Sequence, residues 1–350
     1  MDLREIDTPA LLVDLDAMES NLARMAGFFA GKPAKLRPHF KNHRVVSLAQ
    51  RQLDAGAIGM TVSTLREAEI LVEHGITDIL LANEIAGDLK IRHALDLSAR
   101  SGLIVAVDDA SVVRDMGRLS RSRKAPLNVL VDVNLGMNRC GVPTVEAAVD
   151  LAKLAAAEGL RVRGVMGYEG HLQVLKPGPE KNDVCARATG LLLACAQAIR
   201  REGIAGEIVS TGGTGTHYLA GDAPGVTEIQ AGSYLVMDTA YVERGAVFQR
   251  SLTVLATVIS ARNGSAVLDC GVKAMSGERG LPCLKGIDGA QVKALHAVHG
   301  LVNIADPSVR LTIGDRVELW VYYSDGTINL HQKMYGVRQG TVEEVFTIER

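Results

Sequence analysis

Short apolar runs rich in β-branched residues alternate with longer segments of helical apolar spacing from the N-terminus to about residue 240. Segments such as 16–30 and 63–75 have the spacing of helices. This alternation predicts parallel strands joined by crossover helices, and eight such units close into a barrel of roughly 250 residues. The runs that we interpret as strands are 10–15, 34–40, 57–63, 78–83, 103–109, 127–133, 162–168, 206–211 and 226–232.

Nine runs are one more than a barrel needs. We expect the first run, residues 10–15, to pair outside the barrel because the other eight fill it. A doubly wound open sheet is the structural alternative.

The pattern changes after about residue 245 to period-two runs without long helices, which is typical of antiparallel strands. The Asp325–Gly326 pair indicates a turn between two of these runs. The prediction is therefore an α/β chain with a TIM-type (β/α)8 barrel at 1–245 and a mainly antiparallel β domain at 246–350. The period-two runs are 250–261, 264–272, 315–323 and 340–348.

Composition narrows the possible functions. The net charge is −2 and five cysteines are scattered without a CxxC pair, so neither a nucleic-acid surface nor a disulfide framework is indicated. The start of the chain is charged, and the longest strongly apolar run, 191–199, is too short to span a bilayer. We expect a cytoplasmic protein that acts on a small molecule and binds neither nucleic acid nor a membrane.

Reactive side chains follow several predicted strands, where the active face of a parallel barrel forms. Lys41 follows the run 34–40, Arg139 follows 127–133, and Tyr168 and His171 end or follow 162–168. The glycine-rich stretch "GGTGT" at 212–216 follows the next run. Its backbone N–H groups and threonine hydroxyls are suited to an anion such as phosphate.

Lys41 is the residue of greatest chemical interest. It lies among Arg37, His39, His43 and Arg44, and repulsion between like charges favours the neutral amine that attacks a carbonyl. A lysine that bonds to an aldehyde pairs naturally with a phosphate-anchored aldehyde, pyridoxal 5'-phosphate.

Five ordered blocks carry a family resemblance. They are "RPHFKNHR", "VNLGMNRCG", "GYEGHLQ", "STGGTGTHY" and "TEIQAGSYLVMD". In order and spacing they resemble the D-threonine aldolase and D-serine dehydratase family, whose members are fold type III pyridoxal phosphate enzymes with the alanine-racemase fold. The resemblance runs from about residue 7 to near the C-terminus.

The resemblance implies a role for each block. Lys41 matches the lysine that holds the cofactor covalently, and Arg139 matches the arginine at the cofactor's phenolic oxygen. Tyr168 would lie near the cofactor ring, and His171 matches the histidine that takes the proton of the substrate's β-hydroxyl. The implied cofactor-binding residues at the phosphate are Gly213, Thr214, Gly215, Thr216, Gly232, Ser233 and Tyr234.

The match is incomplete at the metal site. Relatives bind a divalent metal (Mn, Mg or Zn) through a histidine paired with an aspartate or cysteine. Asp325 keeps the aspartate position here, but Tyr323 stands at the histidine position, and tyrosine is a poor ligand for such ions. Tyr322 or Tyr323 could instead serve as an acid or base opposite Lys41, the two-base arrangement of a racemase.

The implied activity is cleavage of a D-threonine-like β-hydroxy-α-amino acid to glycine, or a glycine analogue, and an aldehyde. A dehydratase acting on D-serine or 3-hydroxy-D-aspartate, and an amino-acid racemase, are alternatives on the same scaffold. A non-catalytic cofactor carrier resembles the barrel alone, so the added β domain argues against it; a barrel enzyme without pyridoxal is the remaining alternative. The fold further implies a head-to-tail homodimer.

Overall fold

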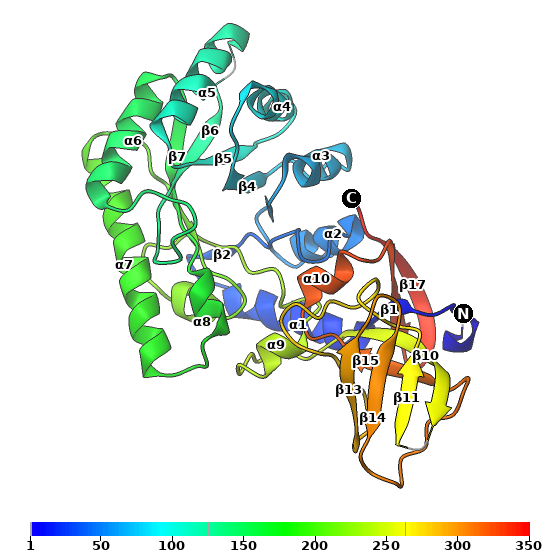
Figure 1. Ribbon diagram of the computed structural model, residues 1–350. Coiled ribbons are helices and arrows are strands. Elements are labelled where there is room, and N and C mark those ends of the chain that lie inside the picture. The colour runs from blue at the N-terminus through cyan, green and yellow to red at the C-terminus, as the bar shows by residue number, and fades with distance from the viewer. Residues whose placement is uncertain (1, 125, 263) are drawn as a thin grey trace. The chain divides into compact units, whose positions relative to one another are not determined.

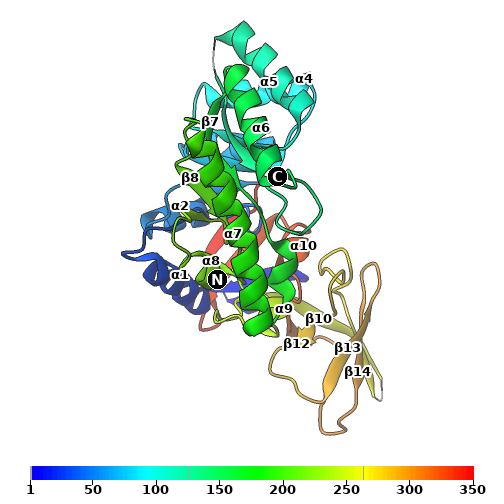
Figure 2. The same cartoon turned by 90° about the vertical axis from the view of Figure 1, so that its left-hand side faces the viewer.

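The computed structural model describes residues 2–124, 126–262 and 264–350, drawn in Figures 1 and 2. It separates into two compact units. The barrel unit comprises Met25–Gly232, and the β unit comprises Met1–Arg24 with Ser233–Glu349. The boundary at 245/246 expected from the sequence stays a prediction. No helix in the described part of the chain is long and apolar enough to cross a bilayer.

The barrel unit contains an eight-stranded parallel sheet in the order β2-β9-β8-β7-β6-β5-β4-β3. A bridge between His39 and Thr61 joins the two ends of this order. Phe40 N donates to Thr61 O (2.8 Å) and Thr61 N to Pro38 O (2.9 Å) across it. The sheet therefore closes, which confirms the predicted barrel and rules out the open doubly wound sheet. The strands are β2 (Lys35–Leu36), β3 (Met60–Val62), β4 (Ile79–Glu84), β5 (Ile104–Val107), β6 (Asn128–Asp132), β7 (Arg161–Met166), β8 (Ile208–Thr211) and β9 (Glu228–Ile229).

Helices follow the strands and cover the barrel from outside. Figure 1 shows α4 to α7 outside the strands, and Figure 2 shows α6 and α7 side by side. Apolar side chains that alternate along the strands fill the interior, among them Leu80, Leu130 and Met166. The helices are α1 (Leu15–Phe29), α2 (Val46–Asp54), α3 (Leu65–Glu73), α4 (Asp88–Ser98), α5 (Ala110–Arg123), α6 (Val145–Ala157), α7 (Pro179–Arg201) and α8 (His217–Ala220), with a short 3-10 helix η2 (Gly170–Val174).

The β unit is built on a mainly antiparallel sheet. Its strand β1 (Ala10–Asp14), the first apolar run of the sequence, pairs antiparallel with β10 and parallel with β16. Strands β1 and β10 are largely buried, which explains their continuous apolar runs. The other elements are η1 (Leu3–Glu5), α9 (Thr239–Val242), β10 (Leu252–Arg262), β11 (Ser265–Leu268), β12 (Cys283–Leu284), β13 (Ala290–Leu295), β14 (Gly300–Ile304), β15 (Arg316–Trp320), α10 (Ser324–Ile328), β16 (Lys333–Arg338) and β17 (Thr341–Thr347).

The turn expected at Asp325–Gly326 is wrong, because both residues lie in the short helix α10. Asp238 accepts hydrogen bonds from Ser324 N (2.8 Å) and Ser324 Oγ (2.7 Å). This buried carboxylate satisfies an N–H group at the start of the helix, a contact from far away in the chain that local sequence does not reveal.

Candidate active site

Lys41 lies in the turn that follows β2. The buried residues Phe40 and Asn42 flank it, and the hydrogen bonds across the bridge to Thr61 fix the preceding backbone. The Lys41 side chain is exposed, and no residue that the structure describes forms a hydrogen bond or ion pair with its amino group. The amino group is thus accessible to the aldehyde of a cofactor, which a lysine must be to form a covalent bond with it.

Arg37 does not contribute the positive charge near Lys41 that the sequence suggested. Its side chain is only 3% exposed and forms two hydrogen bonds with the Glu228 carboxylate, at 3.0 and 2.7 Å. A third bond of 2.7 Å reaches Asp78 Oδ1. Arg37 is thus a buried ion-paired group that joins β2 to the starts of β9 and β4, and carboxylates neutralise its charge.

The two histidines beside Lys41 are also uncharged at neutral pH. Burial lowers the pKa of His43 to about 4, and its Nδ1 accepts a hydrogen bond from Val45 N (3.0 Å). Burial lowers the pKa of His39 well below its ordinary value, and the nearby charges of Lys41 and Arg139 lower it further. The expected repulsion from Arg37, His39 and His43 is therefore wrong. The same facts place Lys41 and Arg139 close to one imidazole.

The loop after β6 packs on the segment after β7. The Arg139 guanidinium carbon lies 5.8 Å from the centre of the Tyr168 ring. A Cβ atom on Gly136 would be 3.4 Å from His171 Cε1, so this loop also contacts His171. His171 Nδ1 is buried and has no hydrogen-bond partner in the described part of the chain. The structure thus gathers Arg139, Tyr168 and His171 on the same end of the barrel as Lys41.

The glycine loop, residues 212–216, follows β8 and is fixed by hydrogen bonds within itself and to η2. Gly213 N donates to Thr216 Oγ1 (3.0 Å), and Gly215 N donates to Gln173 Oε1 (2.7 Å). A Cβ atom on Gly213 would be 2.8 Å from Gln173 Cδ, so a larger residue does not fit there without a shift. Thr214 and Thr216 are buried. An anion at this loop competes with Thr216 and Gln173 for two of its N–H groups.

The block "AGSY" is divided between the two units. Gly232 ends the barrel unit, and a Cβ atom on it would be 2.7 Å from His39 O, so the chain after β9 approaches the segment before Lys41. Ser233 and Tyr234 begin the second part of the β unit. Tyr234 is fully buried there, 5.7 Å from Phe248 between ring centres. Contact of Ser233 and Tyr234 with a cofactor stays a prediction.

The suggested metal and acid-base residues lie in the β unit. Asp325 is in the first turn of α10. The Arg279 guanidinium carbon lies 4.2 Å from the centre of the Tyr323 ring, and burial raises the pKa of Tyr323. Tyr322 OH donates to Glu243 (2.8 Å), which raises the pKa of Tyr322. Within the described residues, no group of three metal-ligating side chains includes Asp325.

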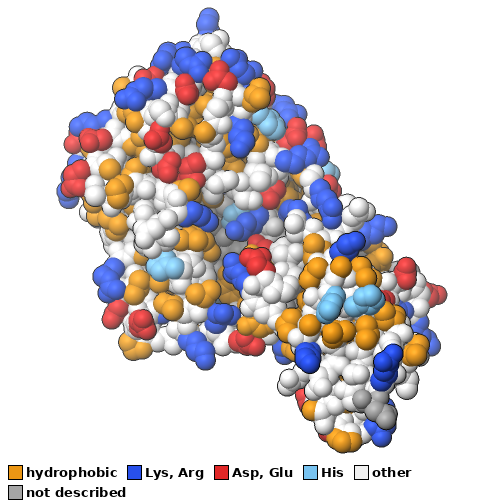
Figure 3. All heavy atoms as spheres, in the orientation of Figure 1, with side chains coloured by type: hydrophobic (Ala, Val, Ile, Leu, Met, Phe, Trp, Pro, Cys, Tyr) orange, Lys and Arg blue, Asp and Glu red, His pale blue; other side chains and the backbone are white. Residues whose placement is uncertain are grey.

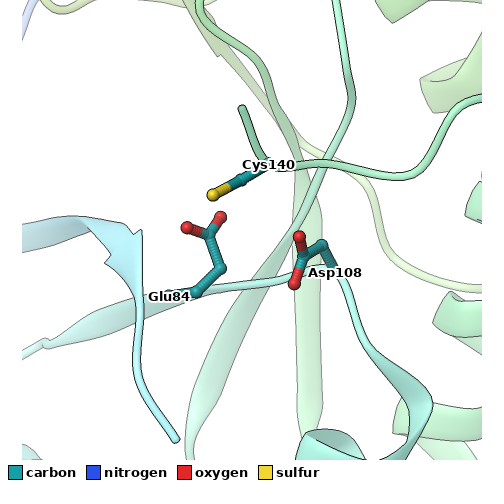
Figure 4. A group of neighbouring side chains, drawn as sticks. All are labelled: Glu84, Asp108 and Cys140. Carbon is teal, nitrogen blue, oxygen red and sulfur yellow. The ribbon is translucent and has the colours of Figure 1, made fainter. Parts of the chain in front are cut away.

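Sequence reasoning missed a cluster of acidic groups on the active face of the barrel. Glu84 ends β4, Asp108 follows β5, and Cys140 follows Arg139 in the loop after β6. One ligand atom from each of the three lies within 4.8 Å of the others, and Figure 4 shows the Cys140 sulfur directed toward the Glu84 carboxylate with Asp108 beside it. Such donors can hold a cation.

Asp132, the last residue of β6, belongs to the same cluster. Burial, followed by the charge of Glu84 and a hydrogen bond with it, raises the pKa of Asp132 to about 8. Burial and Glu84 also raise the pKa of Cys140 to about 11, so its thiol is protonated at neutral pH. In the sequence, Glu84, Asp108 and Asp132 are single acidic residues that end or follow three different strands. Only the adjacency of β4, β5 and β6 would have indicated the cluster.

Two protein families match this chain. The alanine racemase N-terminal domain family matches residues 13–240, and the putative serine dehydratase domain family matches residues 251–337. The chain belongs to the alanine racemase N-terminal domain family. The first match covers the whole barrel unit, Met25–Gly232, and the second lies within the β unit.

Individual relatives narrow this membership to one branch of the family. The chain is 32% identical to 3-hydroxy-D-aspartate aldolase of Paracoccus denitrificans (strain Pd 1222) and 33% identical to D-threonine aldolase of Arthrobacter sp; each match covers 99% of this chain and 93% of the relative. The crystal structure of D-threonine aldolase from Filomicrobium marinum superposes with a TM-score of 0.96 at 34% identity, covering 100% of this chain and 96% of that one. The family resemblance read from the sequence blocks is confirmed.

Proposed function

We propose that this protein is a pyridoxal phosphate-dependent aldolase that cleaves a D-β-hydroxy-α-amino acid, such as D-threonine, to glycine and an aldehyde. The observation that carries the proposal is the gathering of Lys41, Arg139, Tyr168 and His171 on the active end of the barrel. Similarity over nearly the full chain to two aldolases of such substrates supports it. The substrate is a small amino acid, in keeping with a nearly neutral chain without a basic surface.

The residues of the barrel unit fit pyridoxal phosphate. An accessible amine at Lys41 suits the aldehyde, and the compact glycine loop suits the phosphate. The guanidinium of Arg139 is a permanent donor beside the Tyr168 ring, which suits the phenolic oxygen and the flat ring of the cofactor. We propose Gly213, Thr214, Gly215, Thr216, Gly232, Ser233 and Tyr234 as the residues around the phosphate.

Bound pyridoxal phosphate would supply an electron sink for the negative charge left on the substrate Cα when a bond to it breaks. Lys41 would hold the cofactor and exchange it for the substrate amine. His171 would accept the β-hydroxyl proton, as its unpartnered Nδ1 allows. Cleavage of the Cα–Cβ bond would release the aldehyde, and a proton delivered to Cα would complete glycine. The cleavage needs no reactant other than the amino acid, because the proton lost from the hydroxyl equals the proton gained at Cα.

The test is product analysis after incubation of the purified protein with D-threonine, D-serine and 3-hydroxy-D-aspartate, each with added pyridoxal phosphate and with or without a chelator. Glycine together with the matching aldehyde is the expected result. A keto acid with ammonia would instead identify a dehydratase, and loss of optical activity without cleavage would identify a racemase. The incubations with chelator show whether the activity needs a divalent metal. Tyr323 stands where relatives have a metal-binding histidine, so we expect the activity to survive the chelator.

We further propose that the protein works as a head-to-tail homodimer. Several large apolar side chains of the β unit are exposed, including Val272, Leu281, Val298 and Leu330. Figure 3 shows hydrophobic side chains gathered around histidines on the visible face of this unit. Apolar patches of this kind commonly mark protein interfaces. Light scattering after size-exclusion chromatography should give twice the mass of the 37.3 kDa chain.

A cytoplasmic location is the last part of the proposal. All five cysteines are free in the structure, including the exposed Cys283. Free thiols are usual in a reducing compartment. Fractionation of cells that express the protein tests this location.

A further inference from the structure

Glu169 is a buried carboxylate that connects two loops of the proposed site. It is only 2% exposed and lies between Tyr168 and His171 in the sequence. Glu169 Oε2 accepts hydrogen bonds from Thr211 Oγ1 (3.1 Å) and Gly212 N (3.3 Å). Glu169 Oε1 accepts one from Thr216 Oγ1 (2.5 Å). One side chain from the segment after β7 thus contacts both ends of the glycine loop after β8.

The hydroxyl of Thr216 transmits this contact to the middle of the glycine loop. Its hydrogen goes to Glu169, and its oxygen accepts from Gly213 N (3.0 Å) and from Gln173 Nε2 (2.9 Å). Gln173 in turn accepts from Gly215 N (2.7 Å). A hydroxyl has one hydrogen and two acceptor positions, so Thr216 has none left. The loop's shape is therefore set by a network of which Glu169 is the terminal acceptor.

We propose that Glu169 is a positioning residue that holds the glycine loop in the shape that receives the phosphate of pyridoxal phosphate. This inference rests on the proposed function. Glu169 does not itself touch the cofactor in this account; it acts through Thr211, Gly212 and Thr216. Because Tyr168 and His171 flank Glu169, its side chain also connects their segment to the glycine loop by hydrogen bonds.

The direct test is the variant Glu169→Gln. A carboxylate accepts on both oxygens, whereas an amide presents one oxygen and one donor group. The amide NH2 of the glutamine then faces either Thr211 and Gly212 N–H or the Thr216 hydroxyl. The donors on that side lose their buried hydrogen-bond acceptor. We expect the dissociation constant of pyridoxal phosphate, measured by equilibrium dialysis, to rise about tenfold or more. Glu73→Gln, on the exposed end of α3, is the matched control and should leave it unchanged.

A spectroscopic readout separates positioning from a loss of fold. The 31P resonance of the bound phosphate should shift in Glu169→Gln, while kcat at saturating cofactor stays within about threefold of the wild type because the proton-handling groups remain. Equal cofactor affinity in Glu169→Gln and in the wild type would overturn the inference. So would an unshifted phosphorus resonance.

A double-mutant cycle tests the route through Thr216. Thr216→Val removes the hydroxyl at nearly constant volume and should also weaken cofactor binding. Adding Glu169→Gln to it should weaken binding by less than Glu169→Gln does in the wild type, because only the Thr211 and Gly212 contacts are left to lose. Additive effects would contradict a shared network. If Glu169→Gln does not fold, Thr216→Val alone decides, since unchanged affinity in that variant refutes the network. A wild-type protein that binds no pyridoxal phosphate would instead overturn the proposed function itself.

Discussion

The substitution Asp132→Asn should make the protein more stable at neutral and alkaline pH. Asp132 is 7% exposed and shares a hydrogen bond with Glu84. Burial and the Glu84 charge raise its pKa from 3.8 to about 8, so at neutral pH the folded protein keeps a proton on this carboxyl. Asparagine resembles the protonated acid and can still donate a hydrogen bond to Glu84, but it never ionises.

The size and sign of the effect follow from the two pKa values. The unfolded chain releases the Asp132 proton above pH 3.8, whereas the folded chain keeps it until about pH 8. The stability of the folded protein therefore does not depend on Asp132 ionisation below pH 3.8. Between pH 3.8 and about pH 8 the raised pKa of Asp132 lowers the free energy of unfolding as the pH rises, and above pH 8 this loss is constant. At about 1.36 kcal/mol per pH unit, the loss at pH 7 is of the order of 4 kcal/mol. Asp132→Asn removes this loss.

Urea unfolding followed by circular dichroism between pH 4.5 and pH 8.5 measures the effect. The stability of Asp132→Asn minus that of the wild type should increase with pH through this range and then become constant. Asp150→Asn, on the exposed face of α6, is the control and should show no such slope. A difference that does not change with pH, or that falls as the pH rises, would refute the reasoning about the Glu84 and Asp132 pair.

Three further predictions concern the rest of the barrel unit. Glu228→Gln removes one of the two carboxylates that pair with the buried Arg37 charge. It should lower the free energy of unfolding, measured by urea denaturation, by about 3 kcal/mol. Unchanged stability would contradict the role of this ion pair. Gly232→Ala places a Cβ atom 2.7 Å from a main-chain oxygen and should weaken pyridoxal phosphate binding. The control Gly190→Ala, in a helix with no atom within 4 Å of the new Cβ, should leave binding intact. His171→Asn should lower kcat for cleavage about a hundredfold with unchanged cofactor affinity, and full activity would exclude His171 as the base.

Most strands of the barrel could be predicted from the sequence because they are largely buried, mainly apolar runs between helices with clear periodicity. The topology of a parallel barrel then places every strand end on one face. This is why Lys41, Arg139, Tyr168 and His171 could be grouped before their contacts were known. Strand β1 could be set aside by counting alone, since a barrel of this type takes eight strands.

Strands β13 and β16 escaped prediction for a physical reason. β13 alternates buried with exposed residues over only its first four positions and contains only one β-branched side chain, and β16 contains Gly336 and two basic residues. Short half-exposed strands of this kind are stabilised by their neighbours in the sheet more than by their own residues. The helix α10 was missed because the carboxylate that binds its first turn comes from Asp238, far away in the chain.

The charges of the site were the least predictable feature. Neighbours in sequence suggested a cationic cluster at Lys41, but the sequence does not show which side chains are buried or which carboxylates lie beside them in the fold. Arg37 forms ion pairs with Asp78 and Glu228 at the other end of the barrel strands, and burial keeps His39 and His43 uncharged. Conversely, Glu84 and Asp132 are 48 positions apart in the sequence and are hydrogen-bonded in the structure.

The central claim is that Lys41 carries the cofactor. Its most direct test is to load the protein with pyridoxal phosphate, reduce it with borohydride to make the bond to the lysine permanent, and locate the modified peptide by mass spectrometry. We expect one pyridoxyl group per chain, on Lys41, and none in Lys41→Ala. A modified lysine elsewhere, or a wild-type protein that remains unmodified, would contradict it.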